Sequence, residues 1–385
     1  MNRANTKQII VLGLGVVLGV GLARWVLGPN KGDVSRTDSN GTSALMRPSL
    51  IELSQINETL PPGFRATVYA RDIPYPTTLA VDTQGNVYVG SLEEDNQGNV
   101  YVYSDRDEDG LLDKRALFWG PSTPITGILL RQQDVYVASR GKISVLRDRN
   151  GDYVADSVRV IIDDLPHSKQ QPIHANNGLA YGPDGWLYFG MGASCNACLE
   201  PNSLRATVLR CNPRGGACKV FARGLRNVYD VAFHPLDGTL FGADNGSDAI
   251  GGASLDVEDE INLIVEDGEY GWPFCWGKQR GLECGNALPA LAELQPHAAP
   301  AGLTFYTGSS FPRGYRNNLF VALWGDTGRS VVRVILSPRE EGYSARISDF
   351  VRLDRPVDVI TGPDGSLLIA DTDTGRIYRI TYDGS

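Results

Sequence analysis

Short runs of alternating apolar and polar residues recur along most of this chain. Each pair of runs is joined by a turn rich in glycine, aspartate or asparagine, and the second run is often of the Val-Tyr-Val type. Alternation with a period of two is typical of β-strands, and a Pro-Asp-Gly type of turn between two such runs predicts a hairpin. Copies of this hairpin begin at Leu79, Ile128, Leu179, Val231 and Val359, with a weaker copy at Asn317.

The copies recur at a nearly regular interval. They stand roughly 40 to 50 residues apart, which suits one four-stranded blade of a β-propeller. A single blade cannot bury both faces, so the copies must stack in a ring. A Greek-key sandwich would not repeat one turn at a fixed period. The chain is therefore predicted to be all-β, with a six-bladed β-propeller over 60–385 that Gly63 to Ala70 closes by pairing with the C-terminal strands.

The first 28 residues follow a different pattern. Arg3 and Lys7 precede an uncharged apolar run from Ile9 to Ala23. This N-terminal hydrophobic segment, 1–28, fits either a cleaved signal peptide or an uncleaved membrane anchor. Both alternatives place the rest of the chain outside the cytoplasm, in the periplasm or facing outward from the membrane. The polar tract 29–59 is predicted to be a linker.

The cysteines agree with export. All six lie between Cys195 and Cys284, and an even number in an exported protein indicates disulfides. Spacing does not fix their connectivity. No histidine follows the Cys-x-x-Cys pair and no second such pair exists, which argues against haem attachment and a structural zinc site. We expect the three local pairs Cys195–Cys198, Cys211–Cys218 and Cys275–Cys284.

The composition narrows the class of protein. Apolar residues make up 42% of the chain and charged residues 21%, so a buried core is expected rather than wholesale disorder. The net charge of −9 argues against nucleic acid as a partner.

Two acidic loops follow strands at equivalent places in two repeats. Oxygens at positions 1, 3, 5 and 9 of a tight loop can converge on calcium, with glycine at position 6. The first loop has Gly110 there and the second has Tyr153, while Ala116 and Arg159 replace the acidic residue of an EF-hand at position 12. A solvated acidic turn is the alternative. The predicted calcium ligands are Asp105, Asp107, Asp109 and Asp113 in the first loop, and Asp148, Asn150, Asp152 and Asp156 in the second.

Several longer motifs resemble those of one enzyme family. They are GASCNACLEPNSLRATVLRCNPRGG, VFARGLRNVYDVAFHP, GADNGSD and DEINLIVEDGEYGWPFCWG, together with LPPGFRATVYA from Leu60 and HAAPAGLTFYTGSSFP from His297. In order and spacing they resemble the PQQ-dependent sugar dehydrogenases of the sorbosone and soluble glucose dehydrogenase type. The resemblance extends from Leu60 to Tyr382.

The resemblance implies a cofactor site on the top face of the propeller. There calcium holds the acid groups of PQQ, and a histidine takes the proton of the sugar hydroxyl while hydride passes to the quinone. His174 matches this base, and a neutral imidazole is competent near neutral pH. Arg226 and Asn227 match the Gly-Leu-Arg-Asn motif that contacts PQQ, and Arg226 would polarise the quinone oxygen. Gly246 and Ser247 match the turn whose carbonyls bind the cofactor's calcium.

Structural roles are the alternatives for these residues: a core histidine, an arginine between blades and a bare hairpin turn. Arg355 matches an arginine that contacts PQQ carboxylates, and Arg329 lies where a basic residue usually does the same. An ordinary surface arginine is the alternative for both.

The chain also departs from the family pattern. Thr77 and Thr78 stand where an arginine is usual in the first blade, and Asn177 and Gly178 stand where one often follows the catalytic histidine. PQQ is a tricarboxylate, so fewer cationic partners should weaken its binding.

The expected function is therefore PQQ- and calcium-dependent oxidation of an aldose or sugar aldehyde at its anomeric or aldehyde carbon, with electrons passing to a quinone or cytochrome. The alternative is a non-catalytic, calcium-stabilised propeller that has lost the cofactor. A propeller hydrolase would need carboxylates converging on the channel, and the sequence does not place them.

Overall fold

The computed structural model describes residues 50–93, 96–107, 109–167, 174–248, 257–281 and 283–384. The predicted signal peptide or membrane anchor, 1–28, lies outside these residues. Among the residues described, no helix is long and apolar enough to cross a membrane.

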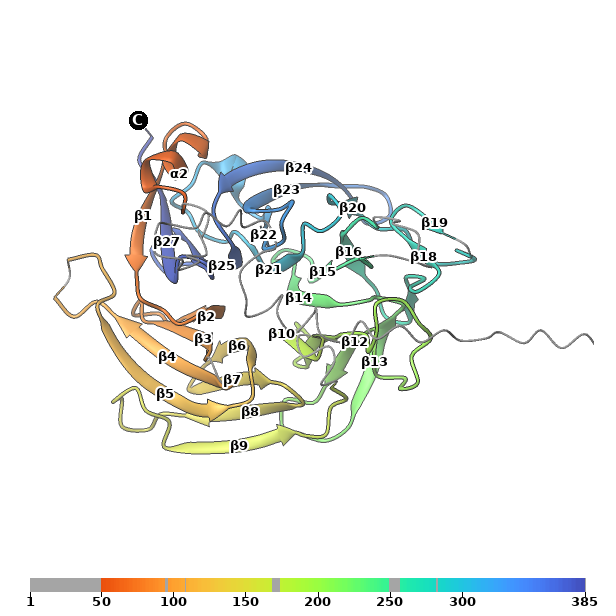
Figure 1. The fold of residues 1–385 in the computed structure, drawn as a ribbon, viewed down its shortest axis with the longest axis horizontal. Helices are drawn as coiled ribbons and strands as arrows, with labels where there is room; N and C mark the ends of the chain where they lie inside the picture. Colours follow the sequence, from red (N-terminus) through yellow and green to blue (C-terminus); the bar gives the residue numbers. More distant parts are fainter. Residues whose placement is uncertain are drawn as a thin grey trace, which may run out of the picture. The chain divides into compact units, whose positions relative to one another are not determined.

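Residues from Leu50 onward form a six-bladed β-propeller, as predicted. Six antiparallel sheets stand around a common centre (Figure 1). The innermost strand of each blade contacts that of the next, and the sixth contacts the first, so the ring is closed. Five predicted hairpins begin within innermost strands. The copy at Asn317 begins instead just before the second strand of the fifth blade.

The first three blades follow the chain from centre to rim. Blade one contains β2 (Pro76–Val81), β3 (Val87–Leu92), β4 (Gly98–Ser104) and β5 (Lys114–Ser122). Blade two contains β6 (Ile125–Arg131), β7 (Asp134–Ser139), β8 (Lys142–Arg147) and β9 (Ser157–Ile162). Blade three contains β10 (Asn176–Tyr181), β11 (Leu187–Met191), β12 (Thr207–Cys211), β13 (Cys218–Arg223) and the short parallel strand β17 (Gly268–Glu269).

The next two blades carry the longer insertions. Blade four contains β14 (Val228–Phe233), β15 (Leu240–Asp244), β16 (Glu260–Ile264) and β20 (Ala292–Glu293). Between the last two lies a separate hairpin, β18 (Cys275–Trp276) and β19 (Arg280–Gly281). Blade five contains β21 (Pro300–Phe305), β22 (Leu319–Leu323), β23 (Ser330–Pro338) and β24 (Tyr343–Arg352), with the 3₁₀ helix η1 (Arg313–Tyr315) between β21 and β22.

The sixth blade joins the two ends of the propeller. It contains β25 (Pro356–Thr361), β26 (Leu367–Asp371), β27 (Arg376–Tyr382) and, at the rim, β1 (Phe64–Ala70). β1 runs antiparallel to β27, with Phe64 opposite Tyr382. The predicted closure by the first strand is confirmed.

The folded body begins before residue 60, within the segment predicted to be linker. The short helix α2 (Leu53–Thr59) packs against β1 and β24, and its Ile56 is fully buried. Just before it, the Ile51 N–H donates to Asp354 Oδ2 at 3.0 Å. The sequence did not reveal this helix, because seven residues are too few to show a helical period.

The Pro-Asp-Gly turns adopt one geometry in different blades. In the turns of blades three and six, Gly185 and Gly365 have φ of +83° and +81°, where glycine is favoured. Each donates its N–H to the carbonyl three residues earlier, at 2.9 and 3.0 Å. The shared geometry explains why the turn recurs in the sequence.

Among the described residues, the core consists of six hydrophobic clusters between neighbouring blades, one of which also includes Ala301 of blade five. Ile143 of blade two and Leu187 of blade three share one cluster, and Leu79 of blade one and Leu368 of blade six share another. Because apolar side chains are buried between sheets, each blade depends on its neighbours.

Two buried aspartates join inner strands across blades. Asp230 on β14 accepts a hydrogen bond from Leu303 N on β21 at 3.0 Å, and Asp358 on β25 accepts one from Leu79 N on β2 at 2.6 Å. Burial raises the pKa of both carboxyls. Each accepts backbone hydrogen bonds, and the charge of Asp358 adds to the effect of burial on the pKa of Asp230.

Candidate functional site

The predicted site residues of blades three and four lie at one end of the inner strands. His174 precedes β10, and Arg226 and Asn227 precede β14. Gly246 and Ser247 follow β15, which runs antiparallel to β14. In an antiparallel pair the start of one strand lies beside the end of the other. The fold therefore gathers these residues at one end of the channel.

His174 is buried, with 5% of its surface exposed. Its Nδ1 lies 3.3 Å from the Ala193 carbonyl oxygen. A carbonyl can only accept, so Nδ1 carries the proton and Nε2 keeps the lone pair. Burial, reinforced by the charge of Arg226, lowers the pKa of His174 to about 3. His174 is therefore a neutral imidazole with Nε2 as its basic atom.

Arg226 is a buried cation surrounded mainly by neutral oxygens. Its Nε and Nη2 donate to Asn196 O and Oδ1 at 3.0 and 2.9 Å, and Nη1 donates to Asn245 O at 3.1 Å. Its guanidinium lies 3.9 Å from the carboxylate of the exposed Asp248, and the charges of Asp244 and Asp259 also act on it. Burial lowers the pKa of Arg226. A buried guanidinium so weakly compensated favours an anionic or strongly polarised ligand.

A second buried arginine lies beside His174. Arg205 Nη1 donates to the carbonyls of His174 and Gly192 at 3.4 and 3.1 Å. Burial lowers the pKa of Arg205, and its charge also helps to lower the pKa of His174. Sequence reasoning missed Arg205, although it lies within the quoted SLRATVLRC motif. In a protein of net charge −9, two buried cations flank the candidate base.

The same backbone arrangement positions an arginine in blades four and six. Asp244 at the end of β15 accepts from the N–H groups of Arg226 and Asn227, at 3.0 and 2.6 Å. Asp371 at the end of β26 accepts from Arg355 N at 2.8 Å. An aspartate ending the second strand thus fixes the residue before the first strand.

A small acidic cavity lies beside Arg226. It has a volume of about 20 Å³, room for one water molecule or ion. Asp244, Glu260, Gly246 and Ser247 are among its lining residues. Burial raises the pKa of both carboxyls, and the charge of Glu260 adds to the effect on Asp244. Both oxygens of Asp244 and one of Glu260 already accept from backbone N–H groups, so a hard cation here would share them.

Asn227 and Ser247 are tied to their neighbours. Asn177 Nδ2 donates to Asn227 Oδ1 at 2.9 Å, and Ser247 Oγ donates to Asn196 O at 2.9 Å. The structure therefore brings together His174, Arg226, Asn227, Gly246 and Ser247.

Arg355 is buried but already paired with carboxylates. Its Nη2 lies 2.6 Å from Asp326 Oδ1, and its Nε lies 3.4 Å from Asp373 Oδ2. Its guanidinium also lies over the Trp324 ring, 4.7 Å from the centroid. Arg329 is partly buried, and its carbonyl accepts from Leu353 N at 3.0 Å. An anionic ligand of Arg355 would compete with two aspartates.

Two departures from the family pattern have structural explanations. Thr77 Oγ1 donates to the Ile125 carbonyl of the next blade at 2.8 Å. A Cβ on Gly178 would lie far inside van der Waals contact with Asp230 Oδ1. Position 177 is filled by Asn177, whose amide also donates to Val228 O at 2.9 Å. These positions serve contacts between blades.

The first acidic loop is assembled as predicted in part. Carboxylate oxygens of Asp105, Asp107 and Asp109 lie within 4.8 Å of one another. Asp105 Oδ1 is a buried atom without a hydrogen-bond partner. The fourth predicted ligand, Asp113, lies instead 4.0 Å from Lys114 Nζ.

The second acidic loop is not assembled in the same way. Asp148 Oδ1 accepts from the N–H groups of Asn150 and Gly151, and its Oδ2 accepts from Tyr153 N, all within 3.1 Å. Asp156 Oδ2 accepts from Arg149 N at 2.6 Å. Among the described residues, its acidic side chains Asp148, Asp152 and Asp156 form no convergent group. Backbone amides occupy the oxygens that the spacing assigned to calcium.

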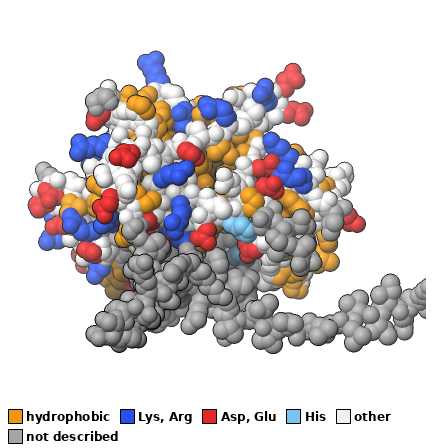
Figure 2. Space-filling model, turned by 45° about the horizontal axis from the view of Figure 1, so that its top comes forward, with side chains coloured by type: hydrophobic (Ala, Val, Ile, Leu, Met, Phe, Trp, Pro, Cys, Tyr) orange, Lys and Arg blue, Asp and Glu red, His pale blue; other side chains and the backbone are white. Residues whose placement is uncertain are grey.

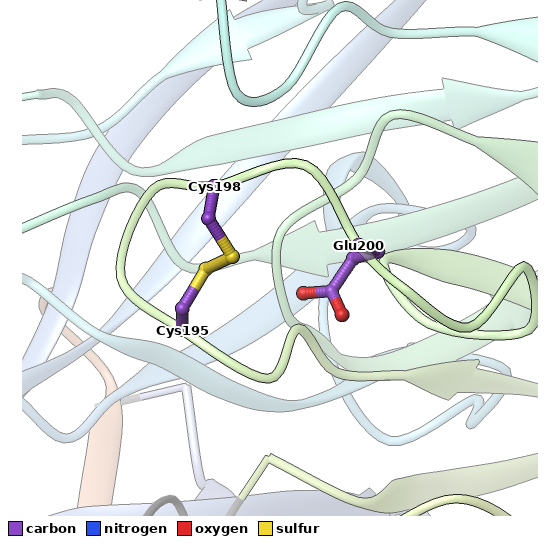
Figure 3. A group of neighbouring side chains, drawn as sticks. All are labelled: Cys195, Cys198 and Glu200. Atoms are coloured by element: carbon purple, nitrogen blue, oxygen red, sulfur yellow. A yellow bond between two sulfur atoms is a disulfide. The ribbon is translucent and has the colours of Figure 1, made fainter. Parts of the chain in front are cut away.

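All three predicted disulfides are present: Cys195–Cys198, Cys211–Cys218 and Cys275–Cys284. Figure 3 shows the first of these beside Glu200. The two sulfur atoms and a Glu200 oxygen lie within 4.8 Å of one another, but the sulfurs are bonded to each other. This group is therefore a disulfide and not a metal site.

Charges are mixed on the face drawn in Figure 2. Acidic and basic side chains alternate over the visible surface without a large patch of one sign.

Comparisons with known proteins agree with this architecture. Residues 52–373 match a family model described as "Domain of unknown function (DUF7133)". An uncharacterized protein of Borreliella burgdorferi is 28% identical over 86% of this chain and 93% of its own length. Quinoprotein glucose dehydrogenase B of Acinetobacter calcoaceticus is 25% identical over 57% of this chain and 62% of its own length, less than two thirds of that enzyme.

A solved structure shares the fold. The PQQ-bound form of aldose sugar dehydrogenase from Streptomyces coelicolor is 22% identical, covers 84% of this chain and 99% of its own, and has a TM-score of 0.64. This similarity confirms the propeller architecture predicted from the sequence.

Proposed function

The chain belongs to the DUF7133 family, and we propose that it is a PQQ- and calcium-dependent dehydrogenase that oxidises an aldose or sugar aldehyde at its anomeric or aldehyde carbon. One observation carries the proposal: a buried neutral histidine, His174, is flanked by the buried guanidinium groups of Arg226 and Arg205. The named functions of the Acinetobacter and Streptomyces proteins support the same class of reaction.

The donor set suits an acidic quinone. Arg226 donates three hydrogen bonds to neutral oxygens, and the carboxylate of Asp248 lies 3.9 Å from its guanidinium. A tricarboxylate cofactor would supply the missing negative charge. Asn227 and, through exchange with Asp326 and Asp373, Arg355 are proposed as further PQQ ligands. Arg329, from the same blade as Asp326, is also proposed to contact PQQ.

The proposed roles follow from the geometry. His174 Nε2 would accept the proton of the sugar hydroxyl, because Nδ1 already donates to Ala193. Arg226 would stabilise negative charge on the quinone oxygen. PQQ, when bound, supplies the hydride acceptor.

Calcium is proposed at two places. The first is beside the Gly246–Ser247 turn, where Asp244 and Glu260 line the small cavity. The second is the first acidic loop, where Asp105, Asp107 and Asp109 converge. In both places a divalent cation would offset carboxylates that otherwise repel one another.

The three disulfides support a location outside the cytoplasm. We propose that the protein works in the periplasm or facing outward from the membrane, held there if the N-terminal segment is uncleaved. A quinone or cytochrome is proposed as the electron acceptor.

The test is reconstitution. The purified protein is incubated with PQQ and calcium, and its absorbance spectrum and dye reduction are followed with a panel of aldoses. Turnover is expected to require both additions. Absence of a bound-PQQ spectrum together with absence of turnover would leave the non-catalytic propeller as the better description.

A matched pair of variants tests the base. His174→Ala should abolish turnover while PQQ binding and the melting temperature change little. His167→Ala is the control, because His167 also contacts a carbonyl through Nδ1, at 3.2 Å, but is exposed. Equal activity of the two variants would exclude His174 as the base.

A further inference from the structure

One short stretch of backbone links His174, the candidate base, to Arg226, the residue proposed to stabilise charge on the quinone oxygen. Ala193 O accepts from His174 Nδ1 at 3.3 Å, and Ala193 N donates to Arg226 O at 2.8 Å. The separation of His174 and Arg226 is thus set through a single residue. What holds this stretch in place also sets the geometry of the site.

Asn196, three residues after Ala193, accepts two hydrogen bonds from the Arg226 side chain. Asn196 O accepts from Arg226 Nε at 3.0 Å, and Asn196 Oδ1 accepts from Arg226 Nη2 at 2.9 Å. The same two oxygens accept from Ser247 Oγ and from Asp248 N, each at 2.9 Å. Asn196 therefore joins the arginine to the turn that follows β15.

Asn196 lies inside the short ring that the Cys195–Cys198 disulfide closes. Cys195 and Cys198 flank it and form a disulfide with a sequence separation of 3. At the base of this ring, Ser194 N donates to Glu200 Oε1 at 2.6 Å, and Figure 3 shows Glu200 beside the disulfide. The ring limits the backbone conformations open to Asn196, so both of its oxygens stay directed at the guanidinium.

We propose that Asn196 is a positioning residue for Arg226 and that the Cys195–Cys198 disulfide is its anchor. Without the ring, a long arginine side chain in a site lined by neutral oxygens would have several hydrogen-bonded arrangements to choose from. With it, the guanidinium has one. We call this arrangement of Asn196, Arg226 and the Cys195–Cys198 disulfide the clamp. Its effect on sugar oxidation rests on the proposed function, but the clamp itself exists in the protein without cofactor.

The clamp can be observed without any turnover. In protein labelled with nitrogen-15 arginine, the Arg226 Nε–H resonance is identified by its absence from Arg226→Lys. Its exchange with solvent is then measured near neutral pH in the cofactor-free protein. In the double variant Cys195→Ser/Cys198→Ser we expect exchange at least about tenfold faster. Loss of one hydrogen bond raises the population of the state open to exchange by about that factor. Asn196→Ala, which keeps the backbone oxygen, should give a smaller increase in the same direction.

Two variants separate positioning from general loss of stability. Cys211→Ser/Cys218→Ser removes a disulfide that joins β12 to β13 and is not among the described hydrogen-bond partners of Arg226. It should lower the melting temperature and leave the Arg226 Nε–H exchange unchanged. Asn196→Asp keeps an acceptor at Oδ1 and should restore most of the protection lost in Asn196→Ala.

Kinetics provide the second readout once the protein is loaded with PQQ and calcium. Loss of the clamp should lower kcat about tenfold and change the sugar KM less than about twofold, the signature of an interaction needed in the transition state. If the unmodified protein oxidises no sugar but the exchange results hold, the proposed function fails and the clamp stands. Unchanged Nε–H exchange in both clamp variants, or equal acceleration in the Cys211/Cys218 control, overturns the clamp.

Discussion

Asp230 occupies the space that a side chain at position 178 would need. A Cβ built on Gly178 would fall far inside van der Waals contact with Asp230 Oδ1, while Asp230 Oδ2 accepts from Leu303 N at 3.0 Å. One carboxylate thus fills the space beside blade three and holds blade five. The arginine that the family resemblance predicts near this position could not be accommodated at position 178 without breaking this contact.

Gly178→Ala is therefore expected to destabilise the propeller. Overpacking of a tight site costs about 1–3 kcal/mol, and here the added methyl group would push on a buried hydrogen-bonded carboxylate. Urea unfolding measures the change. Gly314→Ala is the control, because a Cβ there meets nothing within 4 Å. If the two variants lose equal stability, Asp230 does not limit position 178.

His174 should stay neutral far below the usual range for histidine. Its pKa is lowered to about 3 by burial and by the charge of Arg226. In an NMR titration of the cofactor-free protein, the His174 ring signal, assigned with His174→Gln, should not change between pH 8 and about pH 5. A titration midpoint near the ordinary histidine pKa of about 6.5 would contradict the buried, cation-flanked environment.

Asp358 should make the propeller less stable as pH rises. Burial raises its pKa to about 7, above the ordinary aspartate pKa of about 3.9 that it has when unfolded. Between these values the folded state holds a proton that the unfolded state has lost, so the free energy of unfolding falls with rising pH. The slope is at most about 1.4 kcal/mol per pH unit for one proton.

Asp358→Asn removes this pH-dependent contribution to the free energy of unfolding. Relative to the unmodified protein, the variant should gain stability between pH 5 and pH 8 in urea unfolding. Asp349→Asn, on the exposed surface of β24, controls for the loss of one negative charge. A constant difference between Asp358→Asn and the unmodified protein across this range would show that Asp358 is ionised in the folded state throughout.

Calcium should stabilise the protein through the first acidic loop. A ligand at a hundred times its Kd adds about 2.7 kcal/mol to the free energy of unfolding. Asp107→Asn should reduce the calcium-induced rise in Tm, because Asp107 lies in the convergent group. Asp152→Asn is the matched control from the second loop, where no such group forms. The same calcium response in Asp107→Asn and the unmodified protein would place the cation elsewhere.

The sequence by itself determined the architecture and proposed several residues of the candidate site. Strand alternation and a recurrent turn specify local structure, and a repeat of one blade leaves few ways to bury its faces, so the ring and its closure by Phe64–Ala70 could be predicted. The cysteines indicated disulfides, and the three local pairs that we expected are present. Motif resemblance selected His174, Arg226 and Asn227, which the structure does bring together.

Only the tertiary structure decided how those residues are supported. Arg205 and Asn196 lie 31 and 30 positions from the groups they contact, His174 and Arg226, and no local pattern encodes such contacts. The same holds for Gly178, which is a glycine because of Asp230 on another blade. In the second acidic loop, the spacing predicted calcium ligands, but backbone amides occupy the same oxygens. Spacing along a chain identifies candidates, whereas burial and competing hydrogen bonds decide what they do.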